Sequence, residues 1–293
     1  MVYLETVHLG WEPLLVTWKE LNEELIPKNF MDMIVNGVKT IFERCLDTVA
    51  RQCRQVIQAE NVNLLASCLK LISALILNDE VGDLHKTTIF QPERMIQTYV
   101  VFSLIWSLGA NIHDDSRKNF CRAFVDQVAQ VFTDLSLEAD VYEMGLDRKM
   151  HRFETWDEQL KSYNYDKAQS FFEILVPTSD TTKYQFILKT LTGAGANVLI
   201  TGETGVGKSV ITKDFLMNPP NESIVSSFIN FSGKTTTKNL QDAFEGNLDA
   251  KRRDLLGPPA GKQMVFFIDD VNMPQLDTYF SQPPVELLRQ TID

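Results

Sequence analysis

The chain has 293 residues, of which 44% are hydrophobic and 23% charged, and its formal net charge is −11. This length accommodates one large or two ordinary domains, and the composition is that of a globular protein with a sizeable core. Neither half carries a basic stripe, which argues against a nucleic-acid groove, because clustered Lys and Arg supply the affinity for a phosphate backbone. The short basic cluster at residues 251–253 precedes Asp254, and we interpret it as a solvated face.

The cysteines and histidines predict neither a disulfide framework nor a metal site. There are four cysteines without a C-x-x-C pair, and three of them lie in apolar helical stretches, where a thiol behaves as a small hydrophobe. We therefore expect a reducing, intracellular compartment. No basic region followed by an apolar core opens the sequence, and the most apolar run, residues 99–108, is too short to cross a bilayer, so we expect neither signal peptide nor membrane span.

The first half of the sequence predicts a helical bundle. Apolar residues recur at the 3–4 spacing of one helix face, a proline stands at a tolerated first-turn position of the third segment, and residues 114–116 cap the fourth. Four such helices joined by turns predict a bundle-like subdomain, with its aromatic residues in the core. The predicted helices cover residues 30–55, 62–77, 92–108 and 117–132, and the core aromatics are Phe102, Trp106, Phe120 and Phe124.

From residue 136 the pattern changes. Residues 136–165 are polar and weakly periodic, and we interpret them as an extended connection lying on a neighbouring surface, with Trp156 as an anchor. Strands and helices then alternate, which predicts a parallel sheet with right-handed crossovers. The predicted strands are residues 171–178, 197–201, 223–231 and 264–268, and the predicted helices are 180–191, 209–217 and 235–248. We therefore divide the chain into a helical subdomain (1–135), a connecting segment (136–165) and an α/β part (166–293).

Eight residues between a predicted strand and a predicted helix match G-x-x-x-x-G-K-S, the phosphate-binding loop. They are Gly202, Glu203, Thr204, Gly205, Val206, Gly207, Lys208 and Ser209. The glycines allow successive N–H groups to wrap a phosphate, and the positive end of the following helix faces the same anion. We expect Lys208 to reach the β- and γ-phosphates and the Ser209 hydroxyl to ligate Mg²⁺. The motif predicts a site for ATP or ADP with Mg²⁺.

A second motif fits the first. The apolar run at residues 264–268 ends in Asp269 and Asp270, as a central parallel strand does when it presents carboxylates at its C-terminal end. We expect Asp269 to hold the Mg²⁺ through its water shell, as a Walker-B acid does, and Asp270 to orient or activate the attacking water. An Asp-Asp turn that merely ends a buried strand stays open as the alternative.

Several blocks of residues resemble, in the same order, the AAA+ modules of dynein heavy chains. Residues 267–274 are similar to the Walker-B segment of these modules, and residues 281–290 to the segment that follows it. Residues 176–181 resemble the segment before their phosphate loop. Residues 1–5 and 9–13 resemble the run that enters the helical lid of the second module. The Asp-Asp pair and the Pro-Pro-Val-Glu-Leu-Leu-Arg block favour the axonemal type over the cytoplasmic type.

The resemblance implies an all-α lid subdomain, that of the second AAA+ module, followed by an incomplete P-loop NTPase (AAA+) parallel α/β domain, the start of the third. It implies a regulatory ATP or ADP site in a microtubule motor, with Val176 and Thr178 as the adenine contacts. The implied partners are the remaining modules of the heavy-chain ring, the dynein intermediate and light chains and, indirectly, microtubules. The implied location is the cytoplasm and cytoskeleton, in the axoneme of a cilium or flagellum, with neither nucleic acid nor membrane as partner.

Two departures from the family bear on activity. Asp270 stands where active sites of the family have glutamate, which costs about 1.5 Å of reach, and a misplacement of about 1 Å costs about 10²-fold in rate. The sequence also stops at Asp293, before the family's strand that carries a polar sensor between the phosphate-loop and Walker-B strands. We therefore expect an ATPase-type site with weak binding and negligible turnover, and strand edges that invite aggregation. Two other hypotheses stay open: a stand-alone P-loop ATPase or kinase, and a vestigial structural AAA+ fragment.

Overall fold

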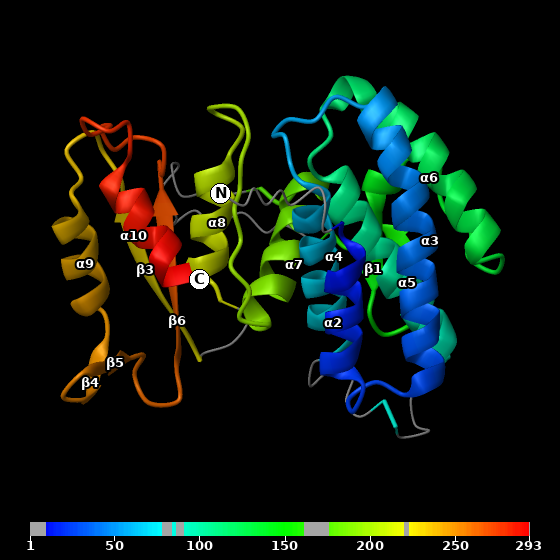
Figure 1. Cartoon of the computed structure of the whole chain (residues 1–293), viewed down its shortest axis with the longest axis horizontal. Coiled ribbons are helices and arrows are strands. Elements are labelled where there is room, and N and C mark those ends of the chain that lie inside the picture. The colour runs from blue at the N-terminus through cyan, green and yellow to red at the C-terminus, as the bar shows by residue number, and fades with distance from the viewer. Residues whose placement is uncertain (1–9, 78–83, 86–90, 161–175, 220–222, 293) are drawn as a thin grey trace, which may run out of the picture. The chain divides into compact units, whose positions relative to one another are not determined.

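A computed structural model of the chain describes residues 10–77, 84–85, 91–160, 176–219 and 223–292 (Figure 1). These residues form two compact units. The first comprises residues 10–160 and 176–183, within the range described, and the second comprises residues 184–292. The boundary falls inside helix α7 (Ser179–Gly193), between Lys183 and Tyr184.

Amphipathic helices build the first unit. Helix α3 packs against α5 and α6, and helix α4 packs against α2 and α5. The inward face of α3 repeats at the predicted helical spacing, with Ile34, Val38 and Ile41 completely buried. The four predicted helices are confirmed, whereas α2 was not predicted. The helices are α2 (Glu12–Asn22), α3 (Lys28–Gln52), α4 (Asn61–Ile76), α5 (Pro92–Leu104) and α6 (Arg117–Val131).

The third predicted helix contains a change of helical type. Helix α5 begins at Pro92, as predicted, and passes into a π-helical turn at Ile105–Gly109. Three of the four predicted core aromatics are buried, and Trp106, on the π-helical turn, is partly buried. Its ring lies 6.2 Å from that of Phe102 and 6.5 Å from that of Trp156, between ring centroids. The first unit therefore contains an aromatic core that joins α5 to the segment after α6.

The segment predicted as an extended connection contains a β-hairpin instead. Strands β1 (Met144–Asp147) and β2 (Arg152–Thr155) pair antiparallel within the described part of residues 136–165. Trp156, directly after β2, is fully buried, as its predicted anchoring role requires, and its Nε1 donates to the Tyr142 carbonyl at 3.0 Å. Strands of four residues show too little alternation for the sequence pattern to distinguish them from a connection.

Two parallel strands form the centre of the second unit. Strand β3 (Ile224–Asn230) pairs with β6 (Gln263–Asp269), both within two residues of their predicted bounds. On one face of β6, Val265 and Phe267 pack against helices α7 and α8 (Lys208–Met217). On the other face, Ile268 packs against α9 (Thr237–Glu245) and α10 (Pro283–Ile292). A parallel strand pair with helices on both faces confirms the predicted α/β class.

The prediction of a buried strand at residues 197–201 was wrong. These residues form no strand, and Val198, Leu199 and Ile200 are 36%, 79% and 38% exposed. A strand needs a neighbour whose backbone groups complete its hydrogen bonds, and within the described residues β3 and β6 pair only with each other. The predicted strand at residues 171–178 lies outside the described residues as far as residue 175, and residues 176–178 form no strand.

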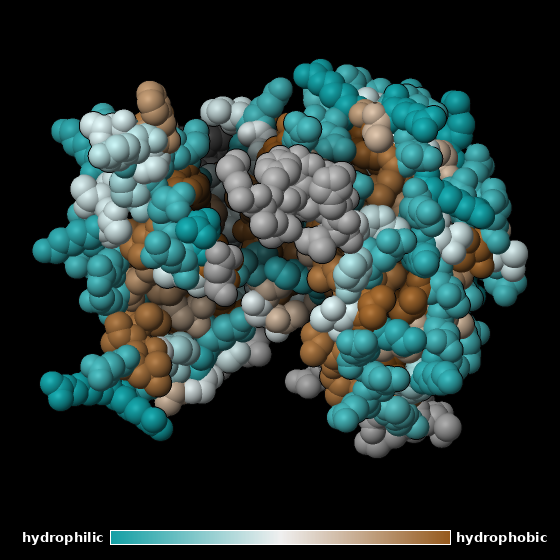
Figure 2. Space-filling view, viewed as in Figure 1, coloured by the Kyte–Doolittle hydropathy of each residue, from teal (hydrophilic) through white to brown (hydrophobic). Residues whose placement is uncertain are grey.

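A second hairpin that the sequence did not indicate belongs to the second unit. Strands β4 (Asp249–Arg252) and β5 (Leu255–Gly257) pair antiparallel, and the basic cluster at residues 251–253 is exposed, as predicted. Leu255 and Leu256 are also exposed. In Figure 2, hydrophobic side chains lie next to strongly hydrophilic ones in the region of this hairpin. The charged residues of β4 disfavour pairing of this exposed hairpin with other chains.

The cysteines lie in the first unit as free thiols, and three of them are buried. Burial raises the pKa of the Cys45 and Cys68 thiols to about 12, so both stay protonated at neutral pH. No helix in the described part of the chain combines the length and the apolar character that a bilayer-spanning segment requires.

Candidate functional site

The glycine-rich loop at residues 202–209 leads directly into helix α8. Gly205 and Gly207 adopt φ angles of 88° and 87°, in the left-handed region that other residues resist. Gly207 is the N-cap of α8, so the unpaired N–H groups of the first helical turn open toward the loop. Helix α8 is held by Ile211 and Phe215, which are buried against α7 and β6. The loop therefore ends at a fixed helix N-terminus.

Lys208 folds back over the loop. Its Nζ donates to the Gly202 carbonyl at 2.9 Å and also to the Glu203 carbonyl. Both acceptors are neutral, and hydrogen bonds between a charged donor and a charged acceptor are stronger than those to neutral groups. A phosphate group is thus a better acceptor for this ammonium than the two carbonyls that hold it.

A hydrogen bond joins the start of helix α8, the helix that follows the loop, to the end of β6. The Ser209 hydroxyl donates to Oδ1 of Asp269 at 2.9 Å, although the two residues are 60 positions apart. The alternation of side chains along β6 explains the meeting, because Asp269 shares a face with Phe267, which packs on α8. The hydroxyl of the loop and the carboxylate of the Asp-Asp strand therefore belong to one site.

A second side chain of α8 reaches the same carboxylate. Nζ of Lys213 lies 3.8 Å from Oδ2 of Asp269. Lys213 follows Ser209 by four residues, so both project from the same face of the helix. We did not predict this residue from the sequence, and its spacing from Ser209 in the predicted helix was the available signal.

The two aspartates at the end of β6 differ in burial and in their contacts. Asp270 has a φ of 57°, a left-handed conformation that Asp tolerates better than most residues, and it ends the strand in a turn. Its carbonyl accepts from the Met273 N–H at 2.9 Å. Asp269 faces α8 and is partly buried, whereas Asp270 is exposed. The pair thus forms a strand-ending turn, and only its first carboxylate contacts the loop helix.

The remaining predicted residues lie in two places. Thr204 and Val206 are exposed parts of the loop. Val176 and Thr178 precede α7 in the first unit, where the Thr178 hydroxyl accepts from the Thr181 N–H at 3.2 Å as a helix cap. The role of Val176 and Thr178 in binding adenine stays a prediction.

The oxygen donors of the site fit Mg²⁺. A serine hydroxyl and a carboxylate are the hard ligands that this ion prefers. No group of three or more His, Cys, Asp or Glu side chains comes together in the described part of the chain. Ser209 and Asp269 are the two groups that could serve as protein ligands, and one or two such ligands are usual for an Mg²⁺ whose coordination phosphate oxygens and water complete.

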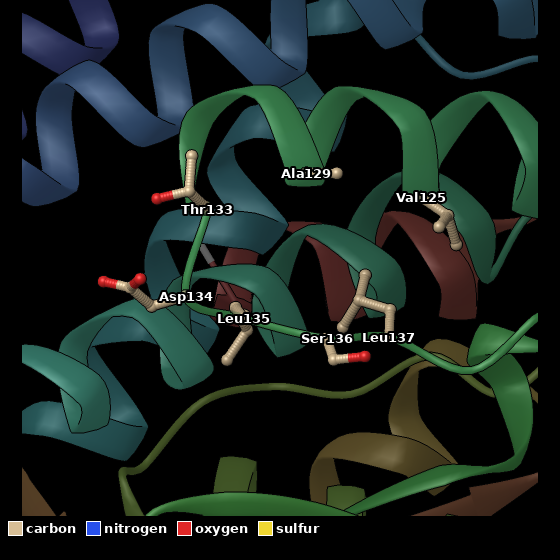
Figure 3. Close-up of a pocket in the computed structure, with 7 residues that line it drawn as sticks. All are labelled: Val125, Ala129, Thr133, Asp134, Leu135, Ser136 and Leu137. Atoms are coloured by element: carbon tan, nitrogen blue, oxygen red, sulfur yellow. The ribbon is translucent and has the colours of Figure 1, made fainter.

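A hollow of about 310 Å³ lies in the first unit, at the C-terminal end of α6 (Figure 3). The described residues that line it include a carboxylate and two hydroxyls but neither Lys nor Arg, so it offers no cation to a phosphate. The lining consists of Val125, Ala129, Thr133, Asp134, Leu135, Ser136 and Leu137. The phosphate-loop region of the second unit thus remains the candidate site.

A glycine-rich loop, a helix N-terminus and a parallel strand ending in a carboxylate define a P-loop α/β domain, here preceded by a helical unit. Two family models match successive parts of the chain. One, described as the P-loop containing dynein motor region, matches residues 163–293. The other, described as the dynein heavy chain AAA lid domain, matches residues 34–158. The fold is therefore an AAA+ lid followed by part of a P-loop domain.

The chain belongs to the dynein heavy-chain family. It is 34% identical to dynein axonemal heavy chain 6 of Homo sapiens over 298 residues, which cover all of the chain and 7% of that protein. It is also 34% identical to dynein axonemal heavy chain 12 of Rattus norvegicus and 30% identical to dynein axonemal heavy chain 3 of Mus musculus. The chain spans 10% and 8% of the lengths of these two relatives.

Proposed function

We propose that the chain is a nucleotide-binding AAA+ segment of an axonemal dynein heavy chain that holds ATP or ADP with Mg²⁺ at a regulatory site. The observation that carries the proposal is the hydrogen bond between Ser209 and Asp269, which joins the phosphate-type loop to the carboxylate strand. A loop alone can occur as a turn before a helix. A loop whose hydroxyl meets the carboxylate at the end of a parallel strand has both halves of a magnesium-nucleotide site.

Each element has a role in this proposal. The glycines and the N-terminus of α8 surround the phosphates with N–H donors, and Lys208 leaves the carbonyls of Gly202 and Glu203 to bind a phosphate oxygen. Ser209 and Asp269 provide the oxygen atoms on the metal side. The metal, when bound, neutralises phosphate charge. Val176 and Thr178 are the proposed adenine contacts.

We propose little turnover at this site. Asp270 occupies the position of the general base. Its carboxyl is exposed, and its side chain is one methylene shorter than the glutamate of active sites in the family. Its backbone sits in a left-handed turn, which directs the chain away from β6 directly after Asp269. A short, exposed carboxyl positions a water molecule poorly, and positioning governs the rate.

The setting in the whole protein is also a proposal. Residues 1–135 are the lid of the second AAA+ module, 136–165 a connecting segment that contains the β1–β2 hairpin, and 166–293 the N-terminal part of the third module. The printed names of the relatives, axonemal heavy chains, support a place in the axoneme of a cilium or flagellum, within the cytoskeleton. The partners are the other modules of the ring and the dynein intermediate and light chains. Nucleotide bound here would regulate movement along microtubules.

Calorimetric titration of the purified chain with ADP and Mg²⁺ tests the binding proposal. We expect saturable binding to one site and a loss of affinity of at least about tenfold in Lys208→Ala, because a hydrogen bond between charged groups contributes about 1.5–3 kcal/mol. The matched control is Lys238→Ala, an exposed lysine of α9 in the same unit. Equal heats for the wild-type chain and Lys208→Ala would contradict nucleotide binding at this loop and favour a structural fragment.

A steady-state ATPase assay tests the second part of the proposal. We expect phosphate release from the wild-type chain with Mg²⁺ to equal that from Lys208→Ala. Clear release above this control would show that the site hydrolyses ATP in this chain, and it would favour the alternative of a self-contained ATPase.

A further inference from the structure

Lys213 shares the Asp269 carboxylate with Ser209. One oxygen, Oδ1, accepts from the Ser209 hydroxyl at 2.9 Å, and the other, Oδ2, lies 3.8 Å from Nζ of Lys213. Both partners come from α8, one helical turn apart. In the described part of the chain, Lys213 is the one cation paired with Asp269. Each oxygen of the carboxylate therefore has its own partner on the loop helix.

The two side chains of the ion pair differ in exposure. The side chain of Asp269 is 24% exposed, whereas that of Lys213 is 49% exposed. The carboxylate is thus held in place by the strand, and the lysine reaches it from the solvent side. A four-carbon stem with half its surface in water can leave the carboxylate without opening the core.

We propose that Lys213 is a positioning residue that holds the Asp269 carboxylate in the nucleotide-free site and weakens metal binding to it. This inference rests on the proposed function. In the nucleotide-free site the ammonium compensates the charge of Asp269 and, as a tethered cation, competes with free Mg²⁺ for the same carboxylate. When Mg²⁺ is bound together with a nucleotide, Lys213 would release the carboxylate and move toward solvent.

The proposal predicts the effect of Mg²⁺ on nucleotide affinity. If Lys213 competes with the metal for Asp269, removal of its charge increases the benefit that Mg²⁺ brings to nucleotide binding. The increase is limited by the strength of a half-exposed ion pair, which corresponds to about a two- to fivefold change in affinity. A lysine that acted only as a general attractor of phosphates would instead change the affinity equally with and without the metal.

The test is calorimetric titration of the full chain with ADP, once in Mg²⁺ and once in EDTA. The measured quantity is the Kd in EDTA divided by the Kd in Mg²⁺. We expect Lys213→Met to raise this ratio about two- to fivefold, with tighter binding in Mg²⁺. Lys213→Arg keeps the charge and is expected to retain the wild-type ratio. Lys238→Met, on the exposed surface of α9, is the matched control and is expected to leave the ratio unchanged.

The outcomes separate this inference from the proposed function. A wild-type chain that binds no ADP in either buffer overturns both. A wild-type chain that binds ADP and loses it in Lys208→Ala, with an unchanged ratio in Lys213→Met, overturns the role of Lys213 alone. Equal weakening by Lys213→Met in Mg²⁺ and in EDTA also overturns it. Because Lys213 is half-exposed, far-UV circular dichroism of the variant is expected to match that of the wild type.

Discussion

The first unit and the second unit contain similarly apolar segments but bury them to different extents. In the first unit, Tyr99, Val100 and Phe102 of α5 are completely buried. In the second unit, all seven residues of β6 are only partly buried, and Leu199, in the segment before the loop, is 79% exposed. The core of the first unit is thus completely buried at these positions. The second unit carries Asp269 of the candidate site on a strand whose apolar residues are only partly buried.

Because of this difference, we expect most of the stability to come from the first unit, whereas the candidate site lies in the second. Completely buried side chains contribute the most to the free energy of unfolding, because their transfer from water is complete. The strand that carries Asp269 lacks that degree of burial. We therefore expect the site to be the less stable region of the chain, as binding regions commonly are.

The largest expected effect comes from a core truncation in the first unit. All four tryptophans lie in this unit, so tryptophan fluorescence in urea follows its unfolding. Phe102→Ala removes a fully buried ring, and we expect it to lower the free energy of unfolding by about 3–5 kcal/mol. Phe267→Ala, at a partly buried position of β6, is expected to change the same transition less.

Equal decreases in the free energy of unfolding for Phe102→Ala and Phe267→Ala would contradict the proposed difference between the units. Phe102→Leu, which retains most of the buried volume, provides a milder variant should the alanine variant not fold. This variant is also expected to lower the free energy of unfolding, but by less than Phe102→Ala does.

A smaller effect is expected from His151, in the turn of the β1–β2 hairpin. Burial lowers the pKa of this imidazole, whose Nδ1 lies 3.3 Å from the Tyr99 hydroxyl. The folded state therefore binds the proton less well than the unfolded state. The stability from this group is present above the usual histidine pKa of about 6.5 and is lost as the pH falls toward the lower folded value.

Urea midpoints followed by tryptophan fluorescence between neutral and mildly acidic pH measure this effect. We expect the wild-type midpoint to fall on acidification and His151→Asn to fall less. Asn is the suitable replacement because His151 has a φ of 51°, which Asn tolerates. Parallel pH profiles for the two proteins would exclude His151 as the cause.

The smallest effect on stability is expected at Leu199. Because its side chain is already 79% exposed, Leu199→Ser is expected to change the free energy of unfolding by less than about 0.5 kcal/mol. Exposed apolar segments promote association, so light scattering is expected to show less aggregate in this variant than in the wild type. A large loss of stability without a change in scattering would mean that the segment is packed in solution.

The sequence pattern predicted those parts of the fold that depend on local periodicity. The apolar spacing of α3 located that helix, and the unbroken run before Asp269 located β6. The strand predicted at residues 197–201 failed because a strand also needs a neighbour, which the local sequence does not reveal. The two hairpins were missed because their strands have three or four residues.

For the candidate site, too, the sequence indicated only what residue type and local spacing reveal. The glycines, Lys208, Ser209 and the two aspartates were found from residue type and spacing. That Asp269 turns toward α8 follows from its place in the alternation of β6, whereas the exposed position of Asp270 depends on a left-handed backbone. Lys213 could not be assigned from the sequence alone, because its contact with Asp269 requires α8 to pack on that face of β6.

Hydrogen–deuterium exchange with ADP and Mg²⁺ is the most direct test of the claim that residues 202–209 hold the nucleotide. The account predicts slower exchange in peptides that span the loop and the first turn of α8, no change in peptides from α3 in the first unit, and no protection of the loop in Lys208→Ala. Unchanged exchange at the loop under saturating ADP, or protection confined to the first unit, would contradict it.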